Sequence, residues 1–216
     1  MEPIWIATIL VGYLLGAIPV GLIVGKATKG IDIRQYGSGK VGATNTLRTL
    51  GWGPSAVVFL LDISKAALSI EIARLVGAPP VVQSLAGVAA VVGHCWSAYI
   101  GFNGGRGVAA SLGTALVVSP VAGLLGLAAA GLVMWRTRYV SLGSLSGAVF
   151  ATLIVVAQVA LGQLDPGYLA LAPATIVIFV RHLDNIERLR AGSERKLGEK
   201  ASKGGGARVV GRTEAP

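Results

Sequence analysis

Residues 108–134 read VAASLGTALVVSPVAGLLGLAAAGLVM, one long apolar run interrupted by Ser119-Pro120. Whether this run crosses a membrane once or twice decides the fold, since about 20 apolar residues are enough for one crossing. A proline inside a helix removes a backbone donor and breaks or kinks the helix. We therefore compare one long helix with two shorter helices that meet at Pro120.

The composition is that of an integral membrane protein. The chain has 216 residues, of which 53% are hydrophobic and only 13% charged, and its mean hydropathy is +0.70. A soluble domain has about 25% charged residues. Five further apolar runs accompany the opening one, over residues 4–24, 54–76, 81–100, 140–161 and 168–180.

The placement of Lys and Arg favours two helices in the opening run. With a break at Pro120 there are seven spans, and the polar segment 26–53, Arg106, Arg136, Arg138 and the C-terminal segment all fall on one side. The loops on the other side then carry no Lys or Arg. Cytoplasmic loops are enriched in these residues, so a single helix, which separates the basic segments, is disfavoured.

We therefore predict an all-α membrane protein, a seven-helix transmembrane bundle with its N-terminus outside and its C-terminus in the cytoplasm. Residues 1–197 are expected to form a single membrane domain, and residues 198–216 a basic, disordered cytoplasmic tail. The net charge is +9, but there is no nucleic-acid-binding motif, so we expect no nucleic acid partner. The His, Cys and acidic residues have no metal-ligand spacing, and we expect no metal or other cofactor.

Three polar clusters fall on the predicted cytoplasmic side. Residues 37–51 read GSGKVGATNTLRTLG, a set of glycines, hydroxyls, an amide and cations that suits a phosphate. The segment lacks the βαβ context of a dinucleotide motif, and the simpler alternative is a solvated loop. Residues 104–107 read GGRG before a helix, which is typical either of an anion site or of a helix turn with a snorkelling arginine. The third cluster, residues 181–188, continues the last span.

These clusters resemble three motifs of the bacterial membrane acyl-phosphate:glycerol-3-phosphate acyltransferases, the PlsY family. Residues 37–51 resemble the motif G-S-G-N-x-G-A-T-N-x-L-R-x-L-G, with Lys40 at the position of the usual Asn. Residues 93–107 resemble G-H-x-F-P-x-x-x-x-F-K-G-G-K-G, with Arg106 at the position of the last Lys. Residues 181–196 match R-H-x-x-N-I-x-R-L-x-x-G-x-E-x-K. The resemblance covers nearly the whole chain before Gly198.

The resemblance implies an enzyme that moves a fatty acyl group from acyl phosphate to the 1-hydroxyl of sn-glycerol 3-phosphate. The products are lysophosphatidate and phosphate, in the first step of bacterial phospholipid synthesis. The resemblance implies direct attack without an acyl-enzyme, at the cytoplasmic face of the inner membrane, and we expect a monomer in the lipid bilayer. The proton acceptor is either His182 or the donor's own phosphate. The alternative from the residues alone is a small transporter of a phosphorylated solute.

The resemblance also implies roles for individual residues. Catalytic roles fall on Ser38, Arg48, Arg106, His182 and Asn185. Substrate-binding roles fall on Gly37, Gly39, Gly42, Thr44, Asn45, Gly104, Gly105, Gly107, Ser141 and Ser144. Glu194 is expected to be structural.

Overall fold

The computed structural model describes residues 2–199, which form helices and connecting loops without a strand. The all-α prediction is therefore confirmed for this part of the chain. The predicted tail, residues 198–216, lies outside the described residues except for its first two. The helices are α1 (Pro3–Ala17), α2 (Val20–Lys29), η1 (Ile33–Gln35), α3 (Ala43–Leu50), α4 (Trp52–Leu75), α5 (Pro80–Cys95), η2 (Ala98–Ile100), α6 (Val108–Val118), α7 (Pro120–Thr137), α8 (Val140–Ala160), η3 (Pro166–Leu171), α9 (Ala172–Arg181) and α10 (Leu183–Arg190).

The break predicted at Pro120 is present. Helix α6 ends at Val118 and α7 begins at Pro120, with Ser119 in an extended conformation between them. The Ser119 hydroxyl accepts the backbone N–H of Ala122, so it caps α7 at the position where Ser is favoured. Pro120 at the first helical position also favours the start of α7, because the N–H that proline lacks would have no partner within the helix.

The first predicted span, residues 4–24, is two helices rather than one. Helix α1 ends at Ala17, and α2 begins after Pro19. The break frees the carbonyl of Ile18, which accepts a hydrogen bond from Lys65 Nζ of α4 at 2.8 Å. Lys65 also pairs with Asp62 at 2.8 Å, and both side chains are buried. The charged pair of α4 thus adds a second donor to a carbonyl that, among the described residues, otherwise accepts only from the N–H of Val20.

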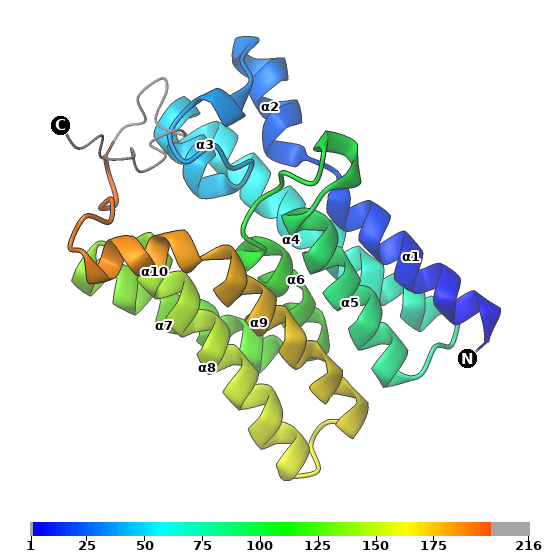
Figure 1. Ribbon diagram of the computed structural model, residues 1–216. Coiled ribbons are helices and arrows are strands. Elements are labelled where there is room, and N and C mark those ends of the chain that lie inside the picture. Colours follow the sequence, from blue (N-terminus) through cyan, green and yellow to red (C-terminus); the bar gives the residue numbers. More distant parts are fainter. Residues whose placement is uncertain (1, 200–216) are drawn as a thin grey trace, which may run out of the picture.

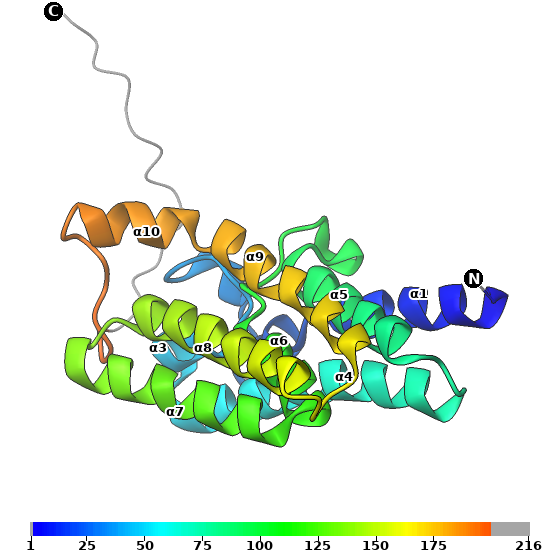
Figure 2. The ribbon, with the colours of Figure 1, turned by 90° about the horizontal axis from the view of Figure 1, so that it is seen from below.

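The helices form two groups with α6 between them (Figure 1). Helices α1, α4 and α5 pack together on one side, and α7, α8 and α9 on the other, while α6 contacts α4 and α7. Helices α2, α3 and α10 gather at one end of the bundle, where α10 lies across the ends of α7 and α8 (Figure 2). The three polar clusters of the sequence therefore meet at this end.

Four stretches of the described residues are long and apolar enough to cross a membrane: Pro3–Lys29, Pro80–Ile100, Pro120–Thr137 and Val140–Ala160. A fifth is added if Pro166–Arg181 and Leu183–Arg190, which meet at 54°, are taken together. This count is below the predicted seven. Two features account for the difference: α4 carries four charged side chains, and α6 has only 11 residues.

Candidate active site

Asn45 fixes the first polar cluster. Its side chain is buried at the start of α3, where Nδ2 donates to the carbonyls of Ile33, Tyr36 and Lys40 at 2.9–3.1 Å. Its Oδ1 accepts the backbone N–H of Ser38 at 3.0 Å. These bonds use both ends of the amide, so Asn45 holds the loop in shape instead of presenting its side chain to a ligand. The loop in turn carries Gly37, Gly39 and Gly42, and Thr44 follows in the first turn of α3.

Arg48 connects this cluster to the C-terminal segment. Its Nη2 lies 3.5 Å from the carbonyl of Arg195. Burial lowers the pKa of the Arg48 guanidinium below its usual value, and the neighbouring charge of Arg195 lowers it further. A half-buried arginine that remains charged is suited to an anionic ligand, since its guanidinium offers several donors in a fixed fork.

The glycines of the second cluster pack against the end of α5. The N–H groups of Gly104 and Gly105 donate to the carbonyls of Cys95 and His94 at 3.2 and 2.9 Å. A Cβ at Gly105 would collide with the His94 ring, and one at Gly104 with the His94 carbonyl. These two glycines therefore allow a close approach of backbones, and their amides are already used. The free N–H groups of this cluster belong to the first turn of α6, after Gly107.

Arg181 ties the second cluster to α9. Its Nε donates to the Gly105 carbonyl at 3.1 Å, and its guanidinium lies over the Trp96 ring, 5.1 Å from the ring centroid. The GGRG loop is thus held from both sides, by α5 and by the last residue of α9. This fixes the position of Arg106 within the loop.

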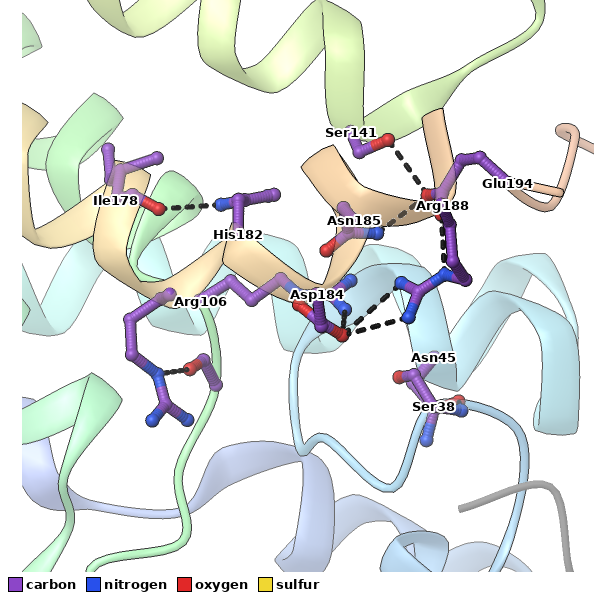
Figure 3. A network of polar contacts seen from close by, with 12 residues as sticks. Ser38, Asn45, Arg106, Ser141, Ile178, His182, Asp184, Asn185, Arg188 and Glu194 are labelled. Atoms are coloured by element: carbon purple, nitrogen blue, oxygen red, sulfur yellow. Dashed lines mark hydrogen bonds and ion pairs between the residues drawn. The ribbon is translucent and has the colours of Figure 1, made fainter. Parts of the chain in front are cut away.

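A network of side chains continues from Arg106 along α10 (Figure 3). Arg106 Nη2 lies 3.0 Å from Asp184 Oδ2, which also accepts from Arg188 at 3.2 Å. Arg188 donates to Glu194 Oε2 at 2.8 Å. The other Glu194 oxygen accepts from Asn185 at 2.6 Å and from Ser141 at 2.8 Å. Glu194 is buried, so the last described loop is anchored to α8 and α10 through this carboxylate.

Two buried polar atoms of this network have no hydrogen-bond partner among the described residues, Arg106 Nε and Asn185 Oδ1. A buried donor without a partner is costly, and such groups in native structures are often directed at a ligand. Burial lowers the pKa of Arg106, and the charge of Asp184 opposes this effect. Arg106 therefore remains a cation that has a free donor.

His182 lies at the break between α9 and α10 and is almost fully buried. Its Nδ1 is 2.8 Å from the carbonyl of Ile178. A carbonyl can only accept, so Nδ1 carries the proton and Nε2 is the acceptor in the neutral ring. The ring is oriented by this backbone carbonyl.

The site is electropositive. The pKa of Lys40 lies below its usual value, because the side chain is partly buried and because Arg181 and Arg106 are nearby. Neighbouring cations disfavour one another's charged form, and a bound anion would relieve this repulsion. The first polar cluster thus contributes Lys40 to the same electropositive region as Arg106.

An apolar cavity begins at Val108, two residues after Arg106 in the chain. It lies between α6, α7, α8, η3 and α9 and measures about 740 Å³ together with the open space at its mouth. Val108 and Ser111 line the end near Arg106, and Tyr168 and Leu169 line the far end. Its hydroxyl groups are largely turned to backbone: Ser144 donates to Val140 and Thr114 to Ser111. The arrangement joins a cationic polar site to a long apolar pocket.

Figure 3 shows Arg106, His182 and Asn185 of the predicted site near one another, with Ser38 and Asn45 opposite the network of α10. Ser141 and Ser144 are bonded to Glu194 and to the Val140 carbonyl. The sequence interpretation missed Asp184. Its spacing of four residues from Arg188 on a helix was the available signal for that pair, but nothing local indicates its contact with Arg106.

The chain is similar to known glycerol-3-phosphate acyltransferases. The family model described as "Glycerol-3-phosphate acyltransferase" matches residues 6–192. A glycerol-3-phosphate acyltransferase of Synechococcus elongatus is 43% identical over 205 residues, which cover 91% of this chain and 96% of that protein. One of Thermus thermophilus is 41% identical over 193 residues, with coverage of 89% and 95%.

Two solved structures are similar to this fold. Both are crystal structures of PlsY (YgiH), described as an integral membrane glycerol 3-phosphate acyltransferase, and each is 35% identical to this chain. The glycerol 3-phosphate form has a TM-score of 0.83 and covers 90% of this chain and 96% of its own. The lysophosphatidic acid form has a TM-score of 0.81, with coverage of 90% and 95%.

Proposed function

The chain belongs to the glycerol-3-phosphate acyltransferase family, and from this premise we propose that its acyl donor is a fatty acyl phosphate. The family, the membrane-protein class and the acyltransferase activity expected from the three motifs are confirmed. The observation that carries the choice of donor is an apolar cavity lined by Val108 and Ser111, which follow closely in the chain after Arg106 and its unpartnered Nε. An acyl phosphate has an anionic head directly attached to an apolar chain, and so fits both parts at once.

In the proposed reaction, the 1-hydroxyl oxygen of sn-glycerol 3-phosphate attacks the carbonyl carbon of the acyl phosphate. A new ester C–O bond forms, the bond from the carbonyl carbon to the phosphate oxygen breaks, and lysophosphatidate and inorganic phosphate leave. The donor is a mixed anhydride with a good leaving group, so no acyl-enzyme is needed. The protein then acts by positioning the two substrates and by stabilising charge.

Arg106 and the first turn of α6 would hold the phosphate of the donor. The guanidinium has a buried Nε without a partner, and the N–H groups after Gly107 add the positive end of the helix. Gly104 and Gly105 would serve by fixing this loop against α5. The acyl chain would extend into the cavity between α6 and α9.

Ser38, on the loop that Asn45 keeps in shape, and Arg48 of α3 would hold glycerol 3-phosphate. Gly37, Gly39 and Gly42 belong to that loop and Thr44 to the first turn of α3, and these four residues would contribute backbone and hydroxyl donors. Asn185 and His182 would close the site from α10. Ser141 and Glu194 would be positioning residues that do not touch the substrate: Ser141 bonds to Glu194, and Glu194 holds Asn185 and Arg188 in place.

The proton of the attacking hydroxyl would go to an oxygen of the donor's phosphate. His182 has a free Nε2, but the contact found at its other nitrogen is the Ile178 carbonyl and not a carboxylate. A carboxylate partner would stabilise the imidazolium that a general base becomes. The phosphate oxygen is next to the reacting carbon in any productive pose and needs no further group.

We also propose seven membrane crossings, with the N-terminus outside and the site at the cytoplasmic face of the bacterial inner membrane. The passes would be α1 with α2, α4, α5, α6, α7, α8, and η3 with α9. Loops that join them alternate between two ends of the bundle, and the basic ones share the end that holds the site. This distribution supports the orientation through the positive-inside rule. A monomer contains every residue of the proposed site.

Phosphate release in detergent tests the proposal. The purified protein receives glycerol 3-phosphate with palmitoyl phosphate or, in parallel, with palmitoyl-CoA or a palmitoyl carrier protein. We expect release of inorganic phosphate only when acyl phosphate and glycerol 3-phosphate are both present, and loss of it in Ser38→Ala and Arg48→Ala. Acyl transfer from the thioesters but not from acyl phosphate would show that the donor is wrong.

A further inference from the structure

The end of the apolar cavity that is distant from Val108 carries a tyrosine ring held by a polar contact. Tyr168 of η3 lines the cavity, and its hydroxyl donates to Gln83 Oε1 of α5 at 2.9 Å. The structure assigns Tyr168 a role in specificity: we propose that its ring is the floor of the acyl pocket and limits the length of the chain that the enzyme accepts. This inference rests on the proposed function, since it assumes that the cavity holds the acyl chain of the donor.

The Tyr168 ring is held in place by a chain of hydrogen bonds. Gln83 is buried, and its Nε2 donates to the Ala78 carbonyl at 2.8 Å. This bond orients the amide so that Oε1 faces Tyr168 and accepts from its hydroxyl. The neighbouring Gly167 carbonyl accepts from Ser84 of the same helix at 3.2 Å. The start of η3 is thus fixed to α5 at two points, so the floor is rigid.

The position of the floor fits the length of a membrane acyl chain. On α8, the cavity is lined from Ser144 to Val156, a distance of about 18 Å along the helix. One leaflet of the hydrocarbon core of a bilayer is about 15 Å thick. A chain that starts at Arg106 and fills the cavity therefore ends near Tyr168.

The walls of the cavity select for hydrocarbon. Thr152 of α8 and Thr175 of α9 are the polar pair at mid-depth, and their hydroxyl oxygens lie 2.7 Å apart. Thr152 also donates to the Ala148 carbonyl at 3.0 Å, so the bond between the two hydroxyls is donated by Thr175. Both hydroxyl protons are engaged within the protein. A substrate with a polar chain would find no free donor at this depth.

The experiment measures kcat/KM for lauroyl, palmitoyl and stearoyl phosphate in detergent, and compares the ratio of stearoyl to lauroyl between variants. Tyr168→Ala removes the floor, and we expect the ratio to rise about tenfold, in line with the discrimination that apolar pockets achieve. Tyr168→Phe keeps the ring but loses the bond to Gln83, and a smaller rise is expected. Ala172→Leu places bulk one helical turn nearer to the site, and the ratio should fall about tenfold.

Leu153→Ala is the matched control, because Leu153 lies on α8 beside the cavity but is exposed and does not line it. Its ratio should equal that of the unmodified enzyme. An unchanged ratio in Ala172→Leu, with turnover of palmitoyl phosphate intact, would overturn the role of Tyr168 as a floor and leave the proposed function standing. Absence of turnover with every acyl phosphate in the unmodified enzyme would overturn both.

Discussion

Arg106 and Asp184 form an ion pair of 3.0 Å although 78 residues separate them in the chain. Arg106 comes from the loop before α6, and Asp184 from the first turn of α10. The pair therefore joins the second and third polar clusters of the sequence. Because Asp184 also pairs with Arg188, it fixes the Arg106 head while leaving the buried Nε free for a ligand.

The first prediction concerns Arg106. Removal of its guanidinium in Arg106→Ala should lower kcat/KM for acyl phosphate about 100-fold, the usual cost of losing a donor to a developing anion. Arg106→Lys keeps the charge but not the planar fork, and should remain within about tenfold of the unmodified enzyme. Phosphate release measures both. Arg136→Ala is the control, since Arg136 is an exposed arginine at the end of α7. Full activity of Arg106→Ala would exclude the proposed donor site.

The second prediction separates the two proton acceptors. If the donor's phosphate takes the proton, His182→Gln should keep kcat/KM within about tenfold, whereas loss of a general base costs roughly 100-fold or more. The pH profile gives an independent readout. A histidine base is active only when neutral, so activity would fall as pH falls through the pKa of the histidine. This fall, the acid limb of the pH profile, would be absent from the Gln variant. An acid limb that is present in the unmodified enzyme and absent from the variant would assign the base to His182.

The third prediction concerns Glu194, which accepts from Ser141, Asn185 and Arg188. Glu194→Gln keeps the shape but loses the charge, and should lower the free energy of unfolding by about 1–3 kcal/mol, since hydrogen bonds to charged groups contribute this much. Thermal unfolding in detergent measures the loss. Glu187→Gln, an exposed change on helix α10, which precedes the Glu194 loop, should leave stability unchanged. A higher KM for glycerol 3-phosphate at unaltered stability would instead place Glu194 among the substrate contacts.

The break at Pro120 could be predicted from the sequence because two signals indicate it: the proline itself and the positive-inside rule. The resemblance to family motifs likewise pointed to Asn45, Arg106, His182 and Glu194 before any contact was known. The sequence could not show that Asn45 is fully used in holding its loop, because its partners are backbone carbonyls. It could not show the contact of Arg106 with Asp184 either, since the two residues meet only after α6 to α9 have packed.

The glycines of the second cluster illustrate the same limit. A glycine-rich turn before a helix indicates an anion site, and free amides at Gly104 and Gly105 would be expected from that pattern. In the structure these amides bond to the end of α5, and the absent Cβ atoms make room for His94. Glycine thus permits either ligand approach or backbone packing, and the choice depends on a helix that is distant along the chain.

The fourth prediction concerns the buried charges of α4. Lys65→Met removes the ammonium that pairs with the buried Asp62, whose remaining neighbour is the His94 ring at 3.4 Å, and it removes one of the two donors that the described residues supply to the Ile18 carbonyl. Breaking such a pair typically costs about 3–5 kcal/mol. The double change of Asp62→Leu with Lys65→Met should cost less than Lys65→Met alone, because no unpaired charge remains. Thermal unfolding compares them with Arg74→Ala, which removes an exposed pair with Glu71 and should have little effect. Equal losses in the single and double variants would mean that Lys65 acts only through the Ile18 carbonyl.

The last prediction uses Lys40, which stands where the family motif has Asn. The pKa of Lys40 is lowered by burial and by the nearby charges of Arg181 and Arg106. Lys40 therefore loses its proton at a lower pH than an ordinary lysine. As pH rises through this lowered pKa, the site loses one positive charge, and KM for the phosphorylated substrates should increase. Lys40→Arg keeps its charge to much higher pH, so KM should stay flat over the same range. Lys26→Arg, an exposed change on α2, is the control and should show the same rise of KM with pH as the unmodified enzyme. If KM of Lys40→Arg also rises with pH in this way, Lys40 does not contribute to phosphate binding.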